Sequence, residues 1–98
     1  LQAGVFHFDH AKRTCRLEGE PLALTPIEYR ILYALAKDAN TLVSRDALLH
    51  AVWELGCAYM DENTLSVHIS RLRGKLGGHS DKLTTVRGEG YLLRCEHE

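Results

Sequence analysis

The sequence predicts an α+β fold in which a small N-terminal antiparallel sheet precedes three helices and a C-terminal β-hairpin. The first observation is a change of period. Apolar residues alternate with polar ones before residue 25, and they recur every three or four positions from there to residue 76. The second is a pair of β-rich segments joined by Gly88-Glu89-Gly90. The third is length, because 98 residues without a linker or repeat suit one domain over residues 1–98.

The composition is that of an ordinary globular protein, with 45% hydrophobic and 26% charged residues. It excludes intrinsic disorder, and no apolar run approaches the ~20 residues that cross a bilayer. Cys15, Cys57 and Cys95 are widely spaced and form no C-x-x-C motif, which argues against a disulfide framework or a zinc ribbon. An odd number of cysteines at irregular spacing favours a reducing compartment, so we expect a cytoplasmic protein. We also expect no metal, no cofactor and no membrane partner.

Residues 1–24 are predicted to form the N-terminal sheet. Residues 5–8 make a β-favouring run that ends at Asp9-His10, residues 14–18 alternate polar with apolar, and residues 21–24 resume the apolar pattern. These segments predict three or four short antiparallel strands.

Two helices are predicted next, over residues 26–38 and about 45–53. Thr25-Pro26-Ile27-Glu28 has the form of a capping box with proline at the first helical position, and Ser44 is placed to cap the second helix. The expected inward residues are Ile27, Ile31, Leu32 and Leu35 in the first helix, and Leu48, Leu49 and Val52 in the second. Residues 56–60 interrupt the helical pattern.

The third helix is predicted over about 62–76, starting at Asp61 and ending at Gly77-Gly78. On a wheel of about 100° per residue, one face is purely apolar and the opposite face is polar apart from one valine. Leu65, Ile69, Leu72 and Leu76 form the core face, Asn63, Thr64, Val67, Ser70, Arg71 and Gly74 the opposite face, and His68, Arg73 and Lys75 the flanks.

A C-terminal hairpin is predicted over 82–95, from β-rich segments at 82–87 and 91–94. A three-helix unit over 25–76 followed by a two-stranded hairpin is the order of a winged helix-turn-helix domain. In such domains the third helix enters a major groove of DNA, and the hairpin is the wing.

The net charge of −1 hides an uneven distribution. Residues 68–94 carry six lysines or arginines against Asp81 and Glu89. A polyanion responds to charge within a Debye length of roughly 8–10 Å, so this local excess matters more than the total. The C-terminal third therefore remains a candidate surface for nucleic acid.

The outward face of the third helix carries the side chains best suited to reading base edges. Arg71 and Asn63 belong to the residue types that make bidentate contacts with guanine and adenine, and Val67 could contact a thymine methyl group. A solvated helix face with an incidental valine has the same composition. The face alone leaves both interpretations open.

The hairpin tip is the second candidate. Arg87 precedes a glycine-containing turn that permits close approach to a surface, and an arginine there can enter a narrow minor groove. An ordinary hairpin with one exposed arginine is the alternative. At the start of the second helix, Arg45 and the free backbone N–H groups could hold a phosphate.

No catalytic arrangement can be assembled, so we expect a protein that is not an enzyme. The sequence offers no convincing Ser/His/Asp or Cys/His set, no paired-carboxylate site and no phosphate-binding loop. His7 and His10 suit a surface or packing role, and Trp53 and Tyr91 suit core or hinge positions. His68 could touch a phosphate or pack half-buried against the protein.

Three stretches, in this order and at this spacing, resemble the OmpR/PhoB family of winged-helix DNA-binding domains, the output modules of two-component response regulators. They are Leu-Thr-Pro-Ile-Glu-Tyr at 24–29, the segment 43–53 with its Val-Ser-Arg start and Val-Trp end, and 67–76 followed by Thr-Val-Arg-Gly-Glu-Gly-Tyr at 85–91. The chain departs from the common pattern at Asn63, Ser66 and Gly74, where members often have Arg, Asp and Lys.

The resemblance implies a role for most polar residues of the third helix and wing. It places Asn63, Val67, Ser70 and Arg71 on bases, Thr64, His68, Arg73, Arg45 and Trp53 near the sugar-phosphate backbone, Thr85 and Arg87 in the wing, and Arg87 in the minor groove. Lys75 completes our set of candidate DNA-binding residues. The loop at 54–61 matches the segment through which some members touch RNA polymerase.

The function expected from this resemblance is sequence-specific binding of double-stranded DNA to control transcription. Two copies would lie head-to-tail on direct-repeat half-sites, associate weakly, and follow an N-terminal receiver domain in the full-length protein. Two alternatives remain: a winged helix used for protein–protein contact, and the DNA-binding domain of a membrane-tethered ToxR-type regulator.

Overall fold

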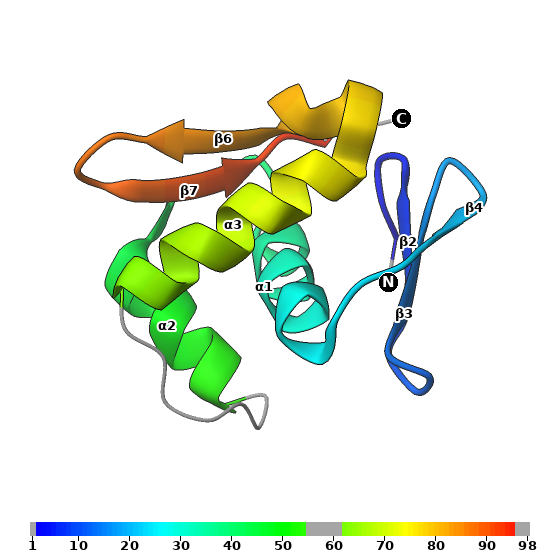
Figure 1. Cartoon of the computed structure of the whole chain (residues 1–98), viewed down its shortest axis with the longest axis horizontal. Helices are drawn as coiled ribbons and strands as arrows, with labels where there is room; N and C mark the ends of the chain where they lie inside the picture. The colour runs from blue at the N-terminus through cyan, green and yellow to red at the C-terminus, as the bar shows by residue number, and fades with distance from the viewer. Residues whose placement is uncertain (1, 55–61, 96–98) are drawn as a thin grey trace.

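Two small sheets flank a group of three helices (Figure 1). This computed structural model describes residues 2–54 and 62–95. The N-terminal sheet packs at one side of the helices, and the C-terminal sheet lies along the third helix and extends beyond the helical group as a hairpin. The element order confirms the predicted α+β class and the winged helix-turn-helix arrangement.

The N-terminal sheet has four antiparallel strands in sequence order, in agreement with the predicted three or four. They are β1 (Gln2–Ala3), β2 (Phe6–Asp9), β3 (Thr14–Leu17) and β4 (Glu20–Leu22). Phe6, Phe8 and Cys15 are buried while their neighbours along the strands are exposed, because successive side chains point to opposite faces. One face of this sheet therefore covers the helices.

Helix α1 (Pro26–Lys37) begins with the predicted capping box and ends one residue before the predicted boundary. The Thr25 hydroxyl accepts the Glu28 backbone N–H at 3.2 Å, and the Glu28 carboxylate accepts the Thr25 N–H at 3.0 Å. The pair satisfies two of the N–H groups that a helix start leaves open. Ile31, Leu32 and Leu35 are buried as expected, so α1 forms the centre of the core.

Helices α2 (Arg45–Glu54) and α3 (Glu62–Leu76) lie close to their predicted ranges. The Ser44 hydroxyl accepts the Ala47 N–H at 3.1 Å, which confirms the predicted cap of α2. Beyond Leu76 the chain does not simply turn at the glycines but continues as the 3₁₀-helix η1 (Gly77–Lys82). Within η1, His79 Nε2 lies 2.5 Å from Glu18 Oε1 and joins the end of α3 to the N-terminal sheet.

The C-terminal sheet corrects the two-stranded hairpin that the sequence predicted. It has three strands in the order β5-β7-β6, formed by β5 (Val43–Ser44), β6 (Leu83–Val86) and β7 (Gly90–Leu93). Gly90, predicted in the turn, instead pairs with Ser44 and Val86. Two residues were too few to produce a recognisable strand pattern, so only long-range pairing identifies β5.

Asn40 fastens the end of this sheet to the loop after α1. Its backbone N–H donates to Leu93 O at 2.8 Å, its amide group donates to Cys95 O at 2.8 Å, and its side-chain oxygen accepts the Cys95 N–H at 3.0 Å. Asn40 has a positive φ of 64°, a conformation that asparagine tolerates better than most residues. The amide thereby continues the pairing of β7 beyond its last residue.

Candidate nucleic-acid interface

Helix α3 separates its side chains as the wheel predicted. Leu65, Ile69, Leu72 and Leu76 are at most 2% exposed and belong to the core. The opposite face is open to solvent, and it consists of Asn63, Thr64, Val67, Ser70, Arg71 and Gly74. Val67 is 47% exposed and is the one apolar side chain of this face. The open face therefore combines amide, hydroxyl, guanidinium and one apolar group.

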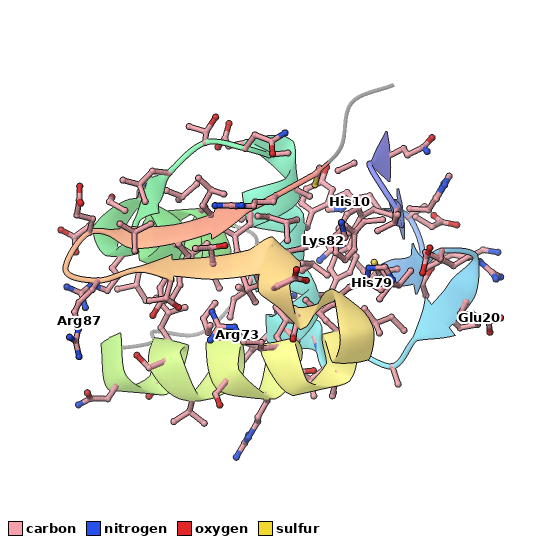
Figure 2. All side chains as sticks on the ribbon, turned by 90° about the horizontal axis from the view of Figure 1, so that it is seen from above. His10, Glu20, Arg73, His79, Lys82 and Arg87 are labelled. Atoms are coloured by element: carbon pink, nitrogen blue, oxygen red, sulfur yellow. The ribbon has the colours of Figure 1, made fainter. Side chains whose placement is uncertain are left out.

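The wing places one arginine at its tip. Residues 87–89 form the turn between β6 and β7, and Arg87 is exposed there. Gly88 has a φ of +77°, the left-handed conformation that glycine adopts at little cost. In both views the tip lies at the N-terminal end of α3 (Figures 1 and 2). Arg87 and the open face of α3 can thus address one extended ligand together.

Helix α2 contributes a basic start and an aromatic end. Arg45, half-buried, is the first residue of α2. Trp53 is 60% exposed and stacks on His50 with ring centroids 6.1 Å apart. Trp53 therefore does not take the core position that was one of its two expected roles, whereas Tyr91 is 5% exposed and lies in the core. Sequence reasoning overlooked His50, although its spacing of three residues from Trp53 places both on one side of a helix.

Two of the candidate cations contact other groups of the protein itself. The Arg73 guanidinium donates to the Leu83 carbonyl oxygen and to the Thr85 hydroxyl, both in β6 (Figure 2). Lys75 Nζ lies 2.5 Å from Glu28 Oε1 in α1. Both residues therefore lie on the flanks of α3, with partners in β6 and α1, and Lys75 remains partly exposed beside the open face. Of the other candidate cations among the described residues, Arg71 and Arg87 are exposed and Arg45 is half-buried.

His68 is half-buried on the flank of α3. Its Nδ1 atom is shielded from solvent and has no hydrogen-bond partner among the residues that the structure describes. The Nδ1 side of the His68 imidazole ring therefore packs against the protein, and the Nε2 side is available to solvent or a ligand. The structure is thus compatible with the packing that the sequence suggested.

The described thiols are poor nucleophiles. Burial raises the pKa of Cys15 to about 12 and raises the pKa of Cys95 above its ordinary value, so both stay protonated near neutrality. Within residues 2–54 and 62–95, no three His, Cys, Asp or Glu residues gather in a way that could hold a metal ion. Over the same residues, every helix is too short or too polar to cross a membrane. The predicted polymerase-contacting loop at 54–61 lies almost entirely outside the described residues.

Comparisons with known proteins agree with this geometry. The family model described as "Transcriptional regulatory protein, C terminal" matches residues 19–93. The transcriptional regulatory protein CseB of Streptomyces avermitilis is 40% identical over 95 residues, which cover 97% of this chain and 39% of that protein. The phosphate regulon transcriptional regulatory protein PhoB of Escherichia coli is 40% identical over 74 residues, covering 74% of this chain and 32% of that protein. The chain thus spans under two fifths of the length of both relatives.

A solved structure gives the same result for the fold. The DNA-binding domain of Klebsiella pneumoniae RstA, crystallised in complex with the RstA box, has a TM-score of 0.76 and 35% identity. The alignment covers 96% of this chain and 95% of that one. The chain belongs to the OmpR/PhoB family, as the winged-helix DNA-binding domain found at the C-terminal end of transcriptional regulatory proteins.

Proposed function

We propose that this domain binds double-stranded DNA in a sequence-specific manner and controls transcription as the output domain of a response regulator. The observation that carries the proposal is the open face of α3, where Asn63, Val67 and Arg71 stand together on the side opposite the leucine core. A helix with one such face fits the width of a B-DNA major groove. The RstA domain, which shares this fold, is known in complex with its DNA box.

In the major groove, each residue type of the open face has a natural partner. Arg71 would make a bidentate contact with guanine O6 and N7, Asn63 would pair with adenine N6 and N7, and Val67 would pack on a thymine methyl group. Ser70 can donate to or accept from several bases. The direct contacts would therefore set the sequence preference from about two and a half turns of α3.

Phosphate contacts would set the orientation of the domain on the duplex. The first turn of α2 offers backbone N–H groups and the Arg45 guanidinium, and the exposed Trp53 offers its indole N–H. Thr64 on the open face, with His68 and Thr85 beside it, would complete the expected backbone contacts. Arg87 at the wing tip would enter the adjoining minor groove, where narrow A·T-rich sequence concentrates negative potential.

Family membership suggests three further features of the full-length protein and its assembly on DNA. An N-terminal receiver domain would account for the additional length of the relatives. Two copies of the domain would bind direct-repeat half-sites head-to-tail, with weak association away from DNA, and loop 54–61 would be available to RNA polymerase.

Selection from a random duplex library tests the proposal and compares the wild type with Arg71→Ala. The wild type is expected to enrich one motif, repeated in direct orientation. Arg71→Ala is expected to lose about 1–3 kcal/mol of binding free energy and to relax the preference at one base position, because one bidentate pair is removed.

The matched control is Arg16→Ala, which removes the same charge from the exposed face of the N-terminal sheet. Its enriched motif should equal that of the wild type. Failure of the wild type to enrich any motif would refute the proposed function, and an unchanged motif in Arg71→Ala would refute the assigned role of that residue.

The salt dependence of binding gives an independent prediction. Each phosphate that is neutralised contributes about −0.9 to the slope of log K against log salt concentration. If Arg45, Arg71 and Arg87 each displace one counterion from the duplex, we expect a slope of about −3, which is modest for a DNA-binding domain. Titration by fluorescence anisotropy between low and physiological salt measures it, and a slope of zero would exclude a polyanionic partner.

A further inference from the structure

The Arg73 side chain bridges two parts of the proposed interface. Its Nε donates to the Leu83 carbonyl oxygen at 3.1 Å, and its Nη2 donates to the same oxygen and to the Thr85 hydroxyl, each at 2.8 Å. Leu83 and Thr85 lie two residues apart on β6, so both contacts fall on one side of that strand. One α3 side chain thereby holds the base of the wing.

We propose that Arg73 is a positioning residue, which sets the wing against α3 so that Arg87 meets the minor groove at a fixed distance from the bases that α3 reads. The inference rests on the proposed function and adds to it a source of specificity. It replaces the direct phosphate contact that the family resemblance implies for this residue.

The chemistry of the two acceptors favours an arginine at this position. Strand β6 is at an edge of the β5-β7-β6 sheet, so the Leu83 carbonyl on its open side has no strand partner. A guanidinium presents several donors in a planar fork and can hold a carbonyl and a hydroxyl at once. The single ammonium of a lysine cannot reproduce that geometry. The site therefore requires the planar set of donors of an arginine, and not only a positive charge.

The length of the wing amplifies any change at its base. Arg87 lies four residues beyond Leu83, which is about 13 Å at about 3.3 Å per residue. A rotation of about 5° at Leu83 would move the tip by about 1 Å, more than the roughly 0.5 Å within which a binding constellation must be held. Figure 2 shows Arg73 between α3 and the wing, with Arg87 at the far tip.

A double-mutant cycle between Arg73→Lys and Arg87→Ala tests the inference on a duplex that carries the selected site. In the wild type, Arg87→Ala is expected to weaken binding about tenfold. In the Arg73→Lys background, Arg87→Ala should weaken binding by less than about threefold, because the wing tip is no longer held at a fixed position relative to α3. Thr85→Val removes one acceptor of Arg73 and keeps the side-chain shape, so Arg87→Ala should cost less in that background than in the wild type. In a Thr85→Ser background, which keeps the hydroxyl, Arg87→Ala should cost as much as in the wild type.

Lysine at position 73 keeps the charge, so a direct phosphate contact would survive that substitution. Near-wild-type affinity of Arg73→Lys, with Arg87→Ala costing the same tenfold, would overturn the positioning role. Arg16→Lys on the N-terminal sheet is the matched control, and its affinity should equal that of the wild type.

Amide hydrogen exchange of the free protein supplies a readout that does not depend on DNA. Arg73→Lys is expected to lower the protection of wing amides such as that of Glu89, which donates to Val86 O at 2.9 Å, by about tenfold. The amides of α1 should keep their protection. An equal loss throughout the domain would identify Arg73 as a general stability residue and overturn the inference. If the wild type binds no duplex, the proposed function is overturned. A loss of amide protection confined to the wing would still support the role of Arg73 in holding β6 against α3.

Discussion

Lys75→Met is expected to lower the free energy of unfolding by about 2–4 kcal/mol at pH 7, although Lys75 lies at the surface end of its ion pair. The Glu28 side chain is 2% exposed and that of Lys75 is 36% exposed. Removing the cation leaves a carboxylate in the core with the Thr25 N–H as its remaining described partner. The solvent exposure of Lys75 reduces the effect below that of a fully buried pair.

The pH dependence of this effect has a definite sign. Desolvation raises the pKa of Glu28, but the hydrogen bonds from Lys75 and Thr25 and the charge of Lys75 outweigh it, and the pKa lies below its ordinary value. In the wild type this carboxylate stabilises the fold above about pH 4.5 and loses its contribution as the pH falls through the lowered pKa. In Lys75→Met, desolvation prevails and the pKa of Glu28 rises, so the variant loses stability as the pH rises.

Urea unfolding at pH 4 and pH 7 measures both parts of the prediction. The difference between wild type and Lys75→Met should be small at pH 4 and should grow toward pH 7. Lys75→Arg should cost less than about 1 kcal/mol because the charge is kept, and Lys12→Met, at an exposed turn, should stay within about 0.5 kcal/mol. A difference that is independent of pH would contradict the assigned role of Glu28.

Gly90→Ala should have an effect of similar size for a steric reason. A methyl group at Gly90 would overlap the Val43 carbonyl oxygen and lie 2.8 Å from Ser44 Cα, closer than carbon atoms pack. Both atoms belong to the backbone of β5, so β5 and β7 must separate. We expect a loss of about 2–4 kcal/mol, from overpacking and from the broken strand pairing, and a fall in Tm of roughly 10–20 °C.

Thermal unfolding measures this loss, and Gly74→Ala serves as the matched control. Nothing lies within 4 Å of a methyl group at Gly74, which is in α3. Because alanine favours a helix over glycine, Gly74→Ala should stabilise the domain by up to about 1 kcal/mol. A Tm for Gly90→Ala within a few degrees of the wild type would show that β5 is not held against β7 in solution.

The helices were predictable because their signals are local. The capping box at Thr25 and Glu28, the Ser44 cap and the leucine stripe of α3 each depend on residues within one to four turns of helix. The structure agrees with these predictions to within a residue or so at the described boundaries. The same stripe identified the open face of α3 correctly, because a helix that buries one side must expose the other.

The placement of individual side chains was harder to predict, because it depends on contacts that no local pattern records. Trp53 is apolar enough for the core, but α2 buries Leu48 and Val52 instead and leaves the indole at the surface. Arg73 and Lys75 have the composition of a DNA-contacting flank, yet their partners lie in β6 and α1. No period or motif in the sequence records such pairs.

The sequence by itself determined the three helices and their order, the buried and open faces of α3, and the family, because each is encoded by short-range period, capping and motif spacing. Only the tertiary structure decided which groups Arg73 and Lys75 contact, that Gly90 lies against β5, and how the wing is held to α3. Those features depend on distances between groups that are 10 to 47 residues apart, as in the Arg73–Leu83 and Lys75–Glu28 pairs, and such distances exist only once the chain has packed.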